Sequence, residues 1–131
     1  MGAADAADSP LVLVVEDDFD LRDALLSLLE VFGVRAAGVE DGTAALAFLR
    51  TGESPKLILL DLMMPRMDGW TFRGAQLRDP DLAAIPIVIV TAHPDVEYAE
   101  RALGALAALR KPFAVESLAT ILAQCLEADP R

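Results

Sequence analysis

The sequence predicts an α/β protein with one parallel sheet of five strands and helices on both faces. Two observations carry this prediction. Short aliphatic runs alternate with segments in which apolar residues recur every three or four positions, and these are the periods of buried strands and amphipathic helices. A repeated strand–helix unit produces parallel strands joined by right-handed crossovers. A length of 131 residues suits a single doubly wound domain of this kind.

The strand-like runs are short and end at polar or turn residues. Leu57–Leu60 is wholly aliphatic, whereas the second and fifth runs contain several alanines. The five predicted strands are, in chain order, Leu11–Val15, Val34–Val39, Leu57–Leu60, Ile85–Val90 and Leu106–Arg110.

Between these runs, apolar residues follow the helical period and capping residues mark the helix ends. Asp41 is a typical N-cap, and Gly33 and Gly104 are typical helix stops. In the third helical segment, Arg73 and Gln76 interrupt the apolar face. The five predicted helices are 21–32, 43–50, 69–78, 94–103 and 115–127.

Composition argues against several classes of function. A net charge of −10 disfavours direct binding to nucleic acid, which needs clustered lysine and arginine. No apolar run approaches the roughly 18 residues of a membrane span, and the first residues lack the pattern of a signal peptide. The single Cys125 cannot form an internal disulfide, which fits the reducing cytoplasm, and its helical spacing predicts a buried, unreactive thiol. We expect a flexible lead-in over residues 1–9, one domain over 10–128 and a short tail over 129–131.

Four of the five predicted strands end at a polar group. Glu16 and Asp17 follow the first strand, Asp61 the third, Thr91 the fourth and Lys111 the fifth. In open parallel sheets, ligand sites form at the carboxyl ends of the strands, so we expect these side chains to meet. Carboxylates in one crevice repel one another unless a cation is bound, and an oxygen-rich site suits Mg²⁺. Together with a hydroxyl and an ammonium group, the pattern predicts phosphoryl transfer to Asp61.

Each of these features also has an ordinary structural explanation. Acidic residues at a strand end commonly cap the next helix, as Asp18 is expected to do. A threonine after a strand and the pair Lys111-Pro112 are common in turns. The joint occurrence of these features at the ends of four strands is what favours a functional site.

With these motifs, the chain resembles the receiver domains of two-component response regulators, of the chemotaxis-receiver type, from about Pro10 to Glu127. The resemblance implies a flavodoxin-like sheet with the strand order 2-1-3-4-5. The matching residues are Glu16-Asp17, Asp61 with Pro65, Asp68 and Gly69 after it, Thr91-Ala92, and Lys111-Pro112-Phe113.

The resemblance also implies a role for each site residue. Asp61 would accept the phosphoryl group, Thr91 and Lys111 would contact its oxygens, and the Lys111–Pro112 peptide would be cis. The donor would be a histidine kinase or a histidine phosphotransfer protein in the cytoplasm, and the output would pass through contact with another protein. The chain would catalyse only its own phosphorylation and dephosphorylation. The implied magnesium ligands are Glu16, Asp17, Asp61 and the main-chain carbonyl of Met63.

Two positions depart from the family pattern. Receivers commonly carry tyrosine or phenylalanine three residues before the lysine, and that ring turns inward when the threonine engages the phosphoryl group. Here the position is Ala108, and the single tyrosine, Tyr98, lies in the preceding helix. Arg73 stands where an aliphatic residue is more usual.

These departures keep a second hypothesis open, namely an interaction module with a receiver fold whose output does not depend on phosphate. A further alternative is an aspartyl-phosphate phosphatase of the haloacid-dehalogenase type. Such an enzyme needs a second acid two residues after its nucleophile, and Met63 occupies that position.

Overall fold

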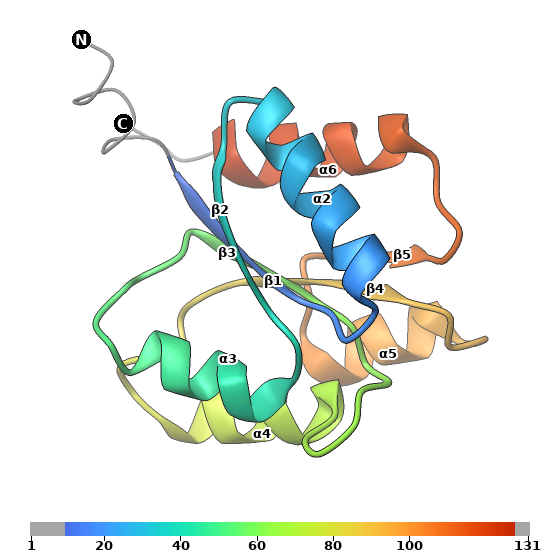
Figure 1. Ribbon diagram of the computed structural model, residues 1–131. Coiled ribbons are helices and arrows are strands. Elements are labelled where there is room, and N and C mark those ends of the chain that lie inside the picture. The colour runs from blue at the N-terminus through green and yellow to red at the C-terminus, as the bar shows by residue number, and fades with distance from the viewer. Residues whose placement is uncertain (1–9, 128–131) are drawn as a thin grey trace, which may run out of the picture.

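The computed structural model describes residues 10–127, and within them it forms a five-stranded parallel sheet in the order β2-β1-β3-β4-β5. Figure 1 shows α2 and α6 on one face of the sheet and α3, α4 and α5 on the other. The predicted fold class and strand order are confirmed. The elements are β1 (Leu11–Val15), α2 (Phe19–Val31), β2 (Arg35–Val39), α3 (Gly42–Leu49), β3 (Leu57–Leu60), α4 (Gly69–Arg78), β4 (Ile87–Thr91), α5 (Val96–Leu103), β5 (Ala107–Arg110) and α6 (Val115–Glu127).

The aliphatic strands separate two hydrophobic cores. Successive side chains of a strand point to opposite faces, so Leu13 and Val15 join the core beneath α3, α4 and α5, whereas Val12 and Val14 join the core beneath α2 and α6. Strands β1, β3 and β4 are buried along their whole length. Each fully buried aliphatic side chain contributes about 1.5–3 kcal/mol through removal from water, which explains the uninterrupted aliphatic runs.

Some predicted element bounds were wrong by one or two residues. The fourth strand begins at Ile87 rather than Ile85, because the Ile85 N–H is donated to the carbonyl of Leu82 in a turn and Pro86 has no N–H to donate. Helix α2 begins at Phe19 rather than at residue 21 because Asp18 caps it. Helix α5 begins at Val96, after its own N-cap.

Aspartates begin four of the helices and thereby set the paths of the loops at the carboxyl edge of the sheet. The side chains of Asp18, Asp41, Asp68 and Asp95 each accept a hydrogen bond from the backbone N–H three residues later, at 2.8–3.2 Å. A cap of this kind contributes about 1 kcal/mol to helix stability. The predicted structural role of Asp18 is therefore confirmed.

Arg73 and Gln76, which interrupt the apolar pattern of α4, are buried in a polar network. The Arg73 guanidinium donates to the Leu103 carbonyl at 3.0 Å and to the Gln76 side-chain oxygen at 2.8 Å. The Gln76 amide donates to the carbonyls of Leu82 and Ile85, each at 2.9 Å. The two side chains thus satisfy backbone groups at the end of α5 and in the turn before β4.

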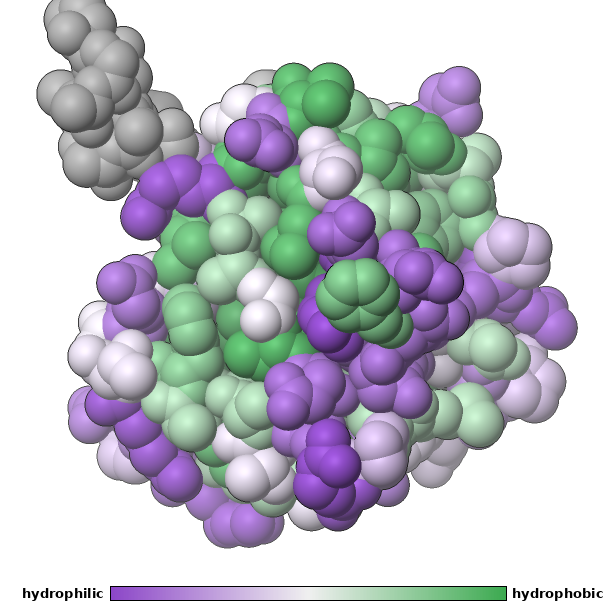
Figure 2. Space-filling view, in the orientation of Figure 1, coloured by the Kyte–Doolittle hydropathy of each residue, from purple (hydrophilic) through white to green (hydrophobic). Residues whose placement is uncertain are grey.

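The free edge of the sheet at β2 carries a groove of about 760 Å³. Figure 2 shows apolar side chains along the front of the molecule between α2 and α3, bordered by charged ones. The groove extends to Leu11, Gly33 and Val34, at the amino ends of β1 and β2. It therefore opens mainly away from the end of the sheet at which the predicted site residues lie.

Two further expectations concern the ends of the chain and Cys125. The predicted lead-in and tail, with Ala128, lie outside the described residues. Cys125 packs against the core beneath α2 and α6, but it is half-buried rather than buried as predicted. Within residues 10–127, no helix has both the length and the apolar character that crossing a bilayer requires.

Candidate functional site

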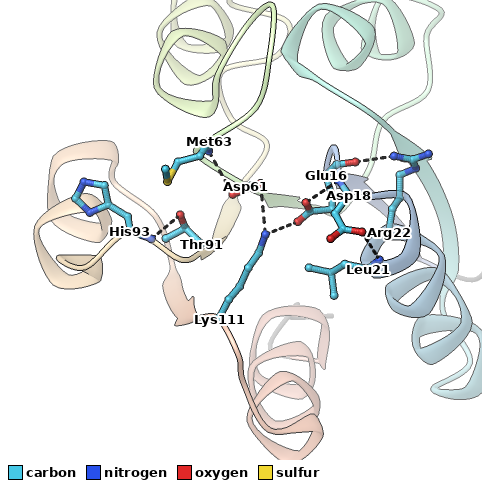
Figure 3. Close-up of polar contacts among 9 residues, drawn as sticks. All are labelled: Glu16, Asp18, Leu21, Arg22, Asp61, Met63, Thr91, His93 and Lys111. Carbon is cyan, nitrogen blue, oxygen red and sulfur yellow. Dashed lines mark hydrogen bonds and ion pairs between the residues drawn. The ribbon is translucent and has the colours of Figure 1, made fainter.

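Residues at the carboxyl ends of four parallel strands form one polar site. Figure 3 shows Asp61 at its centre, with Glu16 on one side, Thr91 on the other and the Lys111 side chain reaching between them. The residues come from the ends of β1, β3, β4 and β5. In doubly wound folds such a crevice forms where the strand order reverses, here between β1 and β3. The structure therefore brings together the side chains that the sequence pattern predicted.

Asp61 is a buried carboxylate held in a fixed position. Its N–H is donated to the Val15 carbonyl at 3.0 Å, and its Oδ1 accepts from the Met63 N–H at 3.3 Å. Its side chain is 4% exposed, and its Oδ2 lies 3.4 Å from Lys111 Nζ. Burial raises the pKa of Asp61, and the nearby positive charge of Lys111 opposes that rise.

Lys111 bridges two acidic side chains. Its Nζ donates to Glu16 Oε1 at 2.8 Å and also forms the ion pair with Asp61. Burial disfavours the charged ammonium, but the contacts with Glu16 and Asp61 outweigh burial and raise the pKa of Lys111. Burial also raises the pKa of Glu16, although the Lys111 hydrogen bond opposes this. The Lys111–Pro112 peptide is cis, as the resemblance implied.

Three acidic side chains, Glu16, Asp17 and Asp61, form a candidate cation site. Each offers a carboxylate oxygen, and these three oxygens lie within 4.8 Å of one another. Asp17 is exposed, whereas the other two are buried, so the cluster opens to solvent on one side. Among the described residues, Lys111 pairs with the two buried members, Glu16 and Asp61. Hard oxygen ligands with an open side fit Mg²⁺. Binding of Mg²⁺ here, and the role of the Met63 carbonyl, stay predictions.

Thr91 links the site to the loop that follows β4. Its side chain is fully buried, and its Oγ accepts a hydrogen bond from the His93 N–H at 3.1 Å. The His93 Nδ1 in turn accepts from the Asp95 N–H at 3.1 Å. In Figure 3 the imidazole of His93 points away from Asp61. The position of His93 after Thr91 therefore does not place its ring over the carboxylate.

Gly69 allows α4 to begin directly beside Asp61. A Cβ atom at Gly69 would lie 2.4 Å from the Asp61 carbonyl oxygen and 2.8 Å from the Leu62 Cα, both of which are backbone atoms. Any other residue would push the helix away from the site. The Gly69 N–H is donated to the Leu62 carbonyl at 3.0 Å, so the loop after Asp61 is closed tightly.

Sequence reasoning missed two tertiary contacts beside the site. The exposed Arg66, in the loop after Asp61, pairs through Nε with the buried Asp41 carboxylate, and its φ of 65° is in the left-handed region. The N–H of Gly42 is donated to the Met67 carbonyl at 3.0 Å. These contacts fasten the loop after Asp61 to the start of α3. No sequence signal could have predicted this pairing, because 25 residues separate Arg66 from Asp41.

The aromatic contact around Trp70 was also missed. The Trp70 ring centroid lies 6.1 Å from that of His93 in an edge-to-face arrangement and 6.2 Å from that of Tyr98. These three residues come from α4, the loop after β4, and α5. Their spacing in the sequence has no helical or strand period that would have indicated a cluster.

Comparisons with known proteins agree with this geometry. Residues 12–123 match the response regulator receiver domain family. The C4-dicarboxylate transport transcriptional regulatory protein DctD of Rhizobium meliloti is 37% identical over 113 residues, which cover 84% of this chain and 24% of that protein. DctD of Pseudomonas aeruginosa is 33% identical over 118 residues, covering 88% of this chain and 25% of that protein. The chain thus spans about a quarter of the length of either relative.

Solved structures show the same likeness. The chemotaxis response regulator CheY4 of Vibrio cholerae superposes with a TM-score of 0.81 at 29% identity, covering 90% of this chain and 99% of that one. The signal receiver domain of a histidine kinase from Syntrophus aciditrophicus gives a TM-score of 0.82 at 30% identity, covering 94% of each chain. The strand order, the matched segment and these relatives agree, and the chain belongs to the response regulator receiver domain family.

Proposed function

We propose that this chain is a phosphorylatable signalling receiver in which Asp61 accepts the phosphoryl group. One observation carries the proposal: a buried carboxylate at the centre of the carboxyl edge lies 3.4 Å from an ammonium group and beside two further acids. Buried acids are normally paired with positive groups that balance them, yet here one lysine pairs with two buried carboxylates, Glu16 and Asp61, and the exposed Asp17 adds a third beside them. Such a charge imbalance suits a site that takes up a divalent cation and a phosphoryl group.

The proposed reaction is an in-line transfer. A carboxylate oxygen of Asp61 attacks phosphorus, the bond from phosphorus to the donor's histidine nitrogen breaks, and the nitrogen keeps the electron pair. Bound Mg²⁺, held by Glu16, Asp17, Asp61 and the Met63 carbonyl, would supply positive charge at the phosphoryl oxygens. Lys111 contributes a mobile point charge to the same oxygens, and Thr91 contributes a hydroxyl donor. The chain catalyses only this transfer and the later hydrolysis.

The electrostatics of the site support the nucleophilic role. Attack requires ionised Asp61, and burial disfavours that form by raising its pKa. The positive charge of Lys111 opposes the rise in the pKa of Asp61 and so favours the ionised form that attack requires. At the same time, burial leaves Asp61 poorly solvated, and a poorly solvated carboxylate is a better nucleophile than a hydrated one.

The proposed partners follow from the family. A cytoplasmic histidine kinase or histidine phosphotransfer protein would donate the phosphoryl group, and an unidentified downstream protein would receive the signal by contact. Several relatives are named as transcriptional regulators, and this chain matches only part of their length. Ala108, half-buried in β5, stands where receivers commonly carry the aromatic ring that responds to phosphorylation. The alternative of a phosphate-independent interaction module therefore stays open.

Acetyl phosphate with Mg²⁺ tests the proposal, with intact-mass measurement as the readout. We expect a single acid-labile gain of roughly 80 Da that is abolished by Asp61→Asn and by chelation of the metal. Asp68→Asn is the matched control, because asparagine keeps the oxygen that caps α4 and Asp68 lies outside the acidic cluster. A gain that persists in Asp61→Asn would show that the site is misassigned. No gain under any condition would favour the phosphate-independent module.

A further inference from the structure

Strand β2 forms a free edge of the sheet. Within the described residues it pairs only with β1, in parallel register. The Arg35 N–H is donated to the Pro10 carbonyl, so the backbone groups of Arg35 and of every second residue after it face β1. The backbone groups of Ala36 and Gly38 therefore point away from the sheet. An edge with such outward N–H and carbonyl groups can accept another strand.

This edge lies in the groove of about 760 Å³ described above, which we call the β2 groove. Figure 1 shows β2 between α2 and α3, and Figure 2 shows apolar side chains in that region. On one face of β2, Leu26 of α2 and Ala36 pack with the core beneath α2 and α6. On the other face, Phe48 of α3 and Ala37 pack with the core beneath α3, α4 and α5. The groove thus has an apolar wall on each side and small side chains along its floor.

Exposed acidic side chains border both walls of the β2 groove. Asp23 and Glu30 lie about two helical turns apart on α2, before and after Leu26, and Glu53 follows α3. Arg35 also lines the groove, so its lining holds three acids and one arginine. The groove therefore presents apolar surface framed by net negative charge.

We propose that the β2 groove binds an extended basic segment of a partner protein, which adds to β2 as a further strand. Main-chain hydrogen bonds to Ala36 and Gly38 would supply the pairing. Side chains of an added strand alternate between the two walls, so apolar ones would contact Leu26 and Phe48. Lysine or arginine side chains on either side of them would meet the bordering acids.

Charge disfavours two other occupants of the groove. A second copy of this chain, paired edge to edge through β2, would bring the acids of both grooves together. Residues 1–9 of the chain itself include Asp5 and Asp8 and no lysine or arginine. The inference does not rest on the proposed function, because the groove opens mainly away from the carboxyl edge that carries Asp61.

The synthetic peptide acetyl-Lys-Lys-Val-Val-Lys-Lys-amide is the probe. Its sequence reads the same in both directions, and as a strand it presents lysine, valine and lysine to each wall. The first and fifth residues of the strand lie about 13 Å apart, close to the rise of about 10 Å between Asp23 and Glu30 along α2. Fluorescence anisotropy of the labelled peptide with the full chain measures the dissociation constant. We expect saturable binding that weakens as salt is added.

Neutralising the bordering acids tests the location of the peptide. The variant that combines Asp23→Asn, Glu30→Gln and Glu53→Gln should bind roughly tenfold more weakly, as expected for the loss of three exposed ion pairs. A control is needed because a net charge of −10 attracts any cationic peptide. The control variant removes the same charge from exposed acids outside the groove and should bind as the wild type does. Its substitutions are Asp81→Asn, Glu97→Gln and Glu116→Gln.

Two changes test the strand pairing. N-methylation of both valine nitrogens keeps the charge of the peptide but removes its central donors, and it should weaken binding roughly tenfold. Ala36→Pro removes an outward N–H without removing a hydrogen bond to β1, a position at which edge strands tolerate proline. This variant should keep its melting temperature and lose the peptide. In the wild type, the peptide should shift the amide signals of Ala36 and Gly38 in nuclear magnetic resonance spectra.

Several results would overturn the inference. These are the absence of binding at peptide concentrations up to about 1 mM, equal binding of the N-methylated peptide, or equal binding by the variant that lacks the bordering acids. Self-association without peptide that Ala36→Pro abolishes would instead identify a second copy as the occupant. If Ala36→Pro does not fold, the N-methylated peptide still decides, because it leaves the protein unchanged. Asp61→Asn should bind the peptide as the wild type does, so this inference and the proposed function can fail separately.

Discussion

Lys111 Nζ lies closer to Glu16, at 2.8 Å, than to Asp61, at 3.4 Å. The lysine is therefore held mainly by Glu16, the acid that follows β1, and its contact with Asp61, the proposed phosphoacceptor, is the longer one. A phosphoryl group on Asp61 would bring new oxygens within reach of an ammonium group that is already in place. Lys111 thus has a structural partner in Glu16, and under the proposed function it would gain another on phosphorylation.

Removal of Lys111 should destabilise the protein. Lys111→Met leaves Glu16 and Asp61 without their positive partner, and breaking a partly buried ion pair of this kind costs about 2 kcal/mol. Urea unfolding at neutral pH without Mg²⁺ measures this cost. Lys56→Met, at a lysine outside the acidic cluster, is the comparison. An unfolding free energy equal to that of the wild type would contradict the ion-pair role.

The free energy of unfolding should depend on pH through the protonation of Asp61. Burial raises its pKa in the folded state, so the fold binds this proton more tightly than the unfolded chain does. This tighter proton binding stabilises the folded state at pH values below the pKa of Asp61 in the unfolded chain. The stabilisation is lost as pH rises through the raised pKa of the folded state. Asp61→Asn should therefore stabilise the metal-free protein at neutral pH, with a gain that shrinks on acidification. Thermal scans across pH, with Asp68→Asn as control, measure this gain in stability. A gain that grows as the pH falls would contradict the predicted direction of the pH dependence.

Magnesium should stabilise the wild type through Asp17. Asp17 is the exposed member of the acidic cluster, and neutralising it removes both a hard oxygen ligand and a repulsive charge. We expect Asp17→Asn to raise the melting temperature without Mg²⁺ and to eliminate the metal-induced rise. Asp23→Asn, an exposed aspartate of α2, should change neither. Equal stabilisation by Mg²⁺ in the wild type and in Asp17→Asn would exclude Asp17 as a ligand.

The phosphorylated state should persist for longer than minutes. Met63 is apolar and 60% exposed, so it cannot orient a hydrolytic water, and the His93 ring is turned away from Asp61. Met63→Asn places a polar amide at that position and should accelerate loss of the roughly 80 Da adduct. Leu77→Asn likewise places an asparagine at an exposed apolar position, in α4, and should have no effect. A lifetime that is unchanged or longer in Met63→Asn counts against this explanation.

Phosphorylation should have little effect on association through β5. Because Ala108 cannot report a displacement of Thr91, we expect any dimerisation constant to change by less than about tenfold, or roughly 1.4 kcal/mol. Sedimentation equilibrium with and without acetyl phosphate measures this change. Ala108→Tyr restores a ring at the position and serves as the comparison. Strong phosphate-driven dimerisation of the wild type through the surface around Ala108 would show that the missing ring is not needed.

Much of the fold was predictable because strand and helix periods are local properties. A run such as Leu57–Leu60 favours a buried strand, and an aspartate before a helical segment favours an N-cap, through interactions close in the sequence. The same locality explains the prediction of the site. Polar residues that directly follow parallel strands must gather at one edge of the sheet, so the sequence alone predicts that Asp61 and Lys111 lie close together.

By itself, then, the sequence determined the βα repeat, the two cores and the polar groups at the carboxyl edge. Only the tertiary structure decided which polar groups pair, and how. Arg73 interrupted an apolar pattern, but its burial against the end of α5 depends on how two helices pack. The contacts of Trp70 with His93 and Tyr98 depend on loop paths that no periodicity encodes. Periodicity specifies which face of an element is buried, whereas contacts between elements depend on their relative positions in three dimensions.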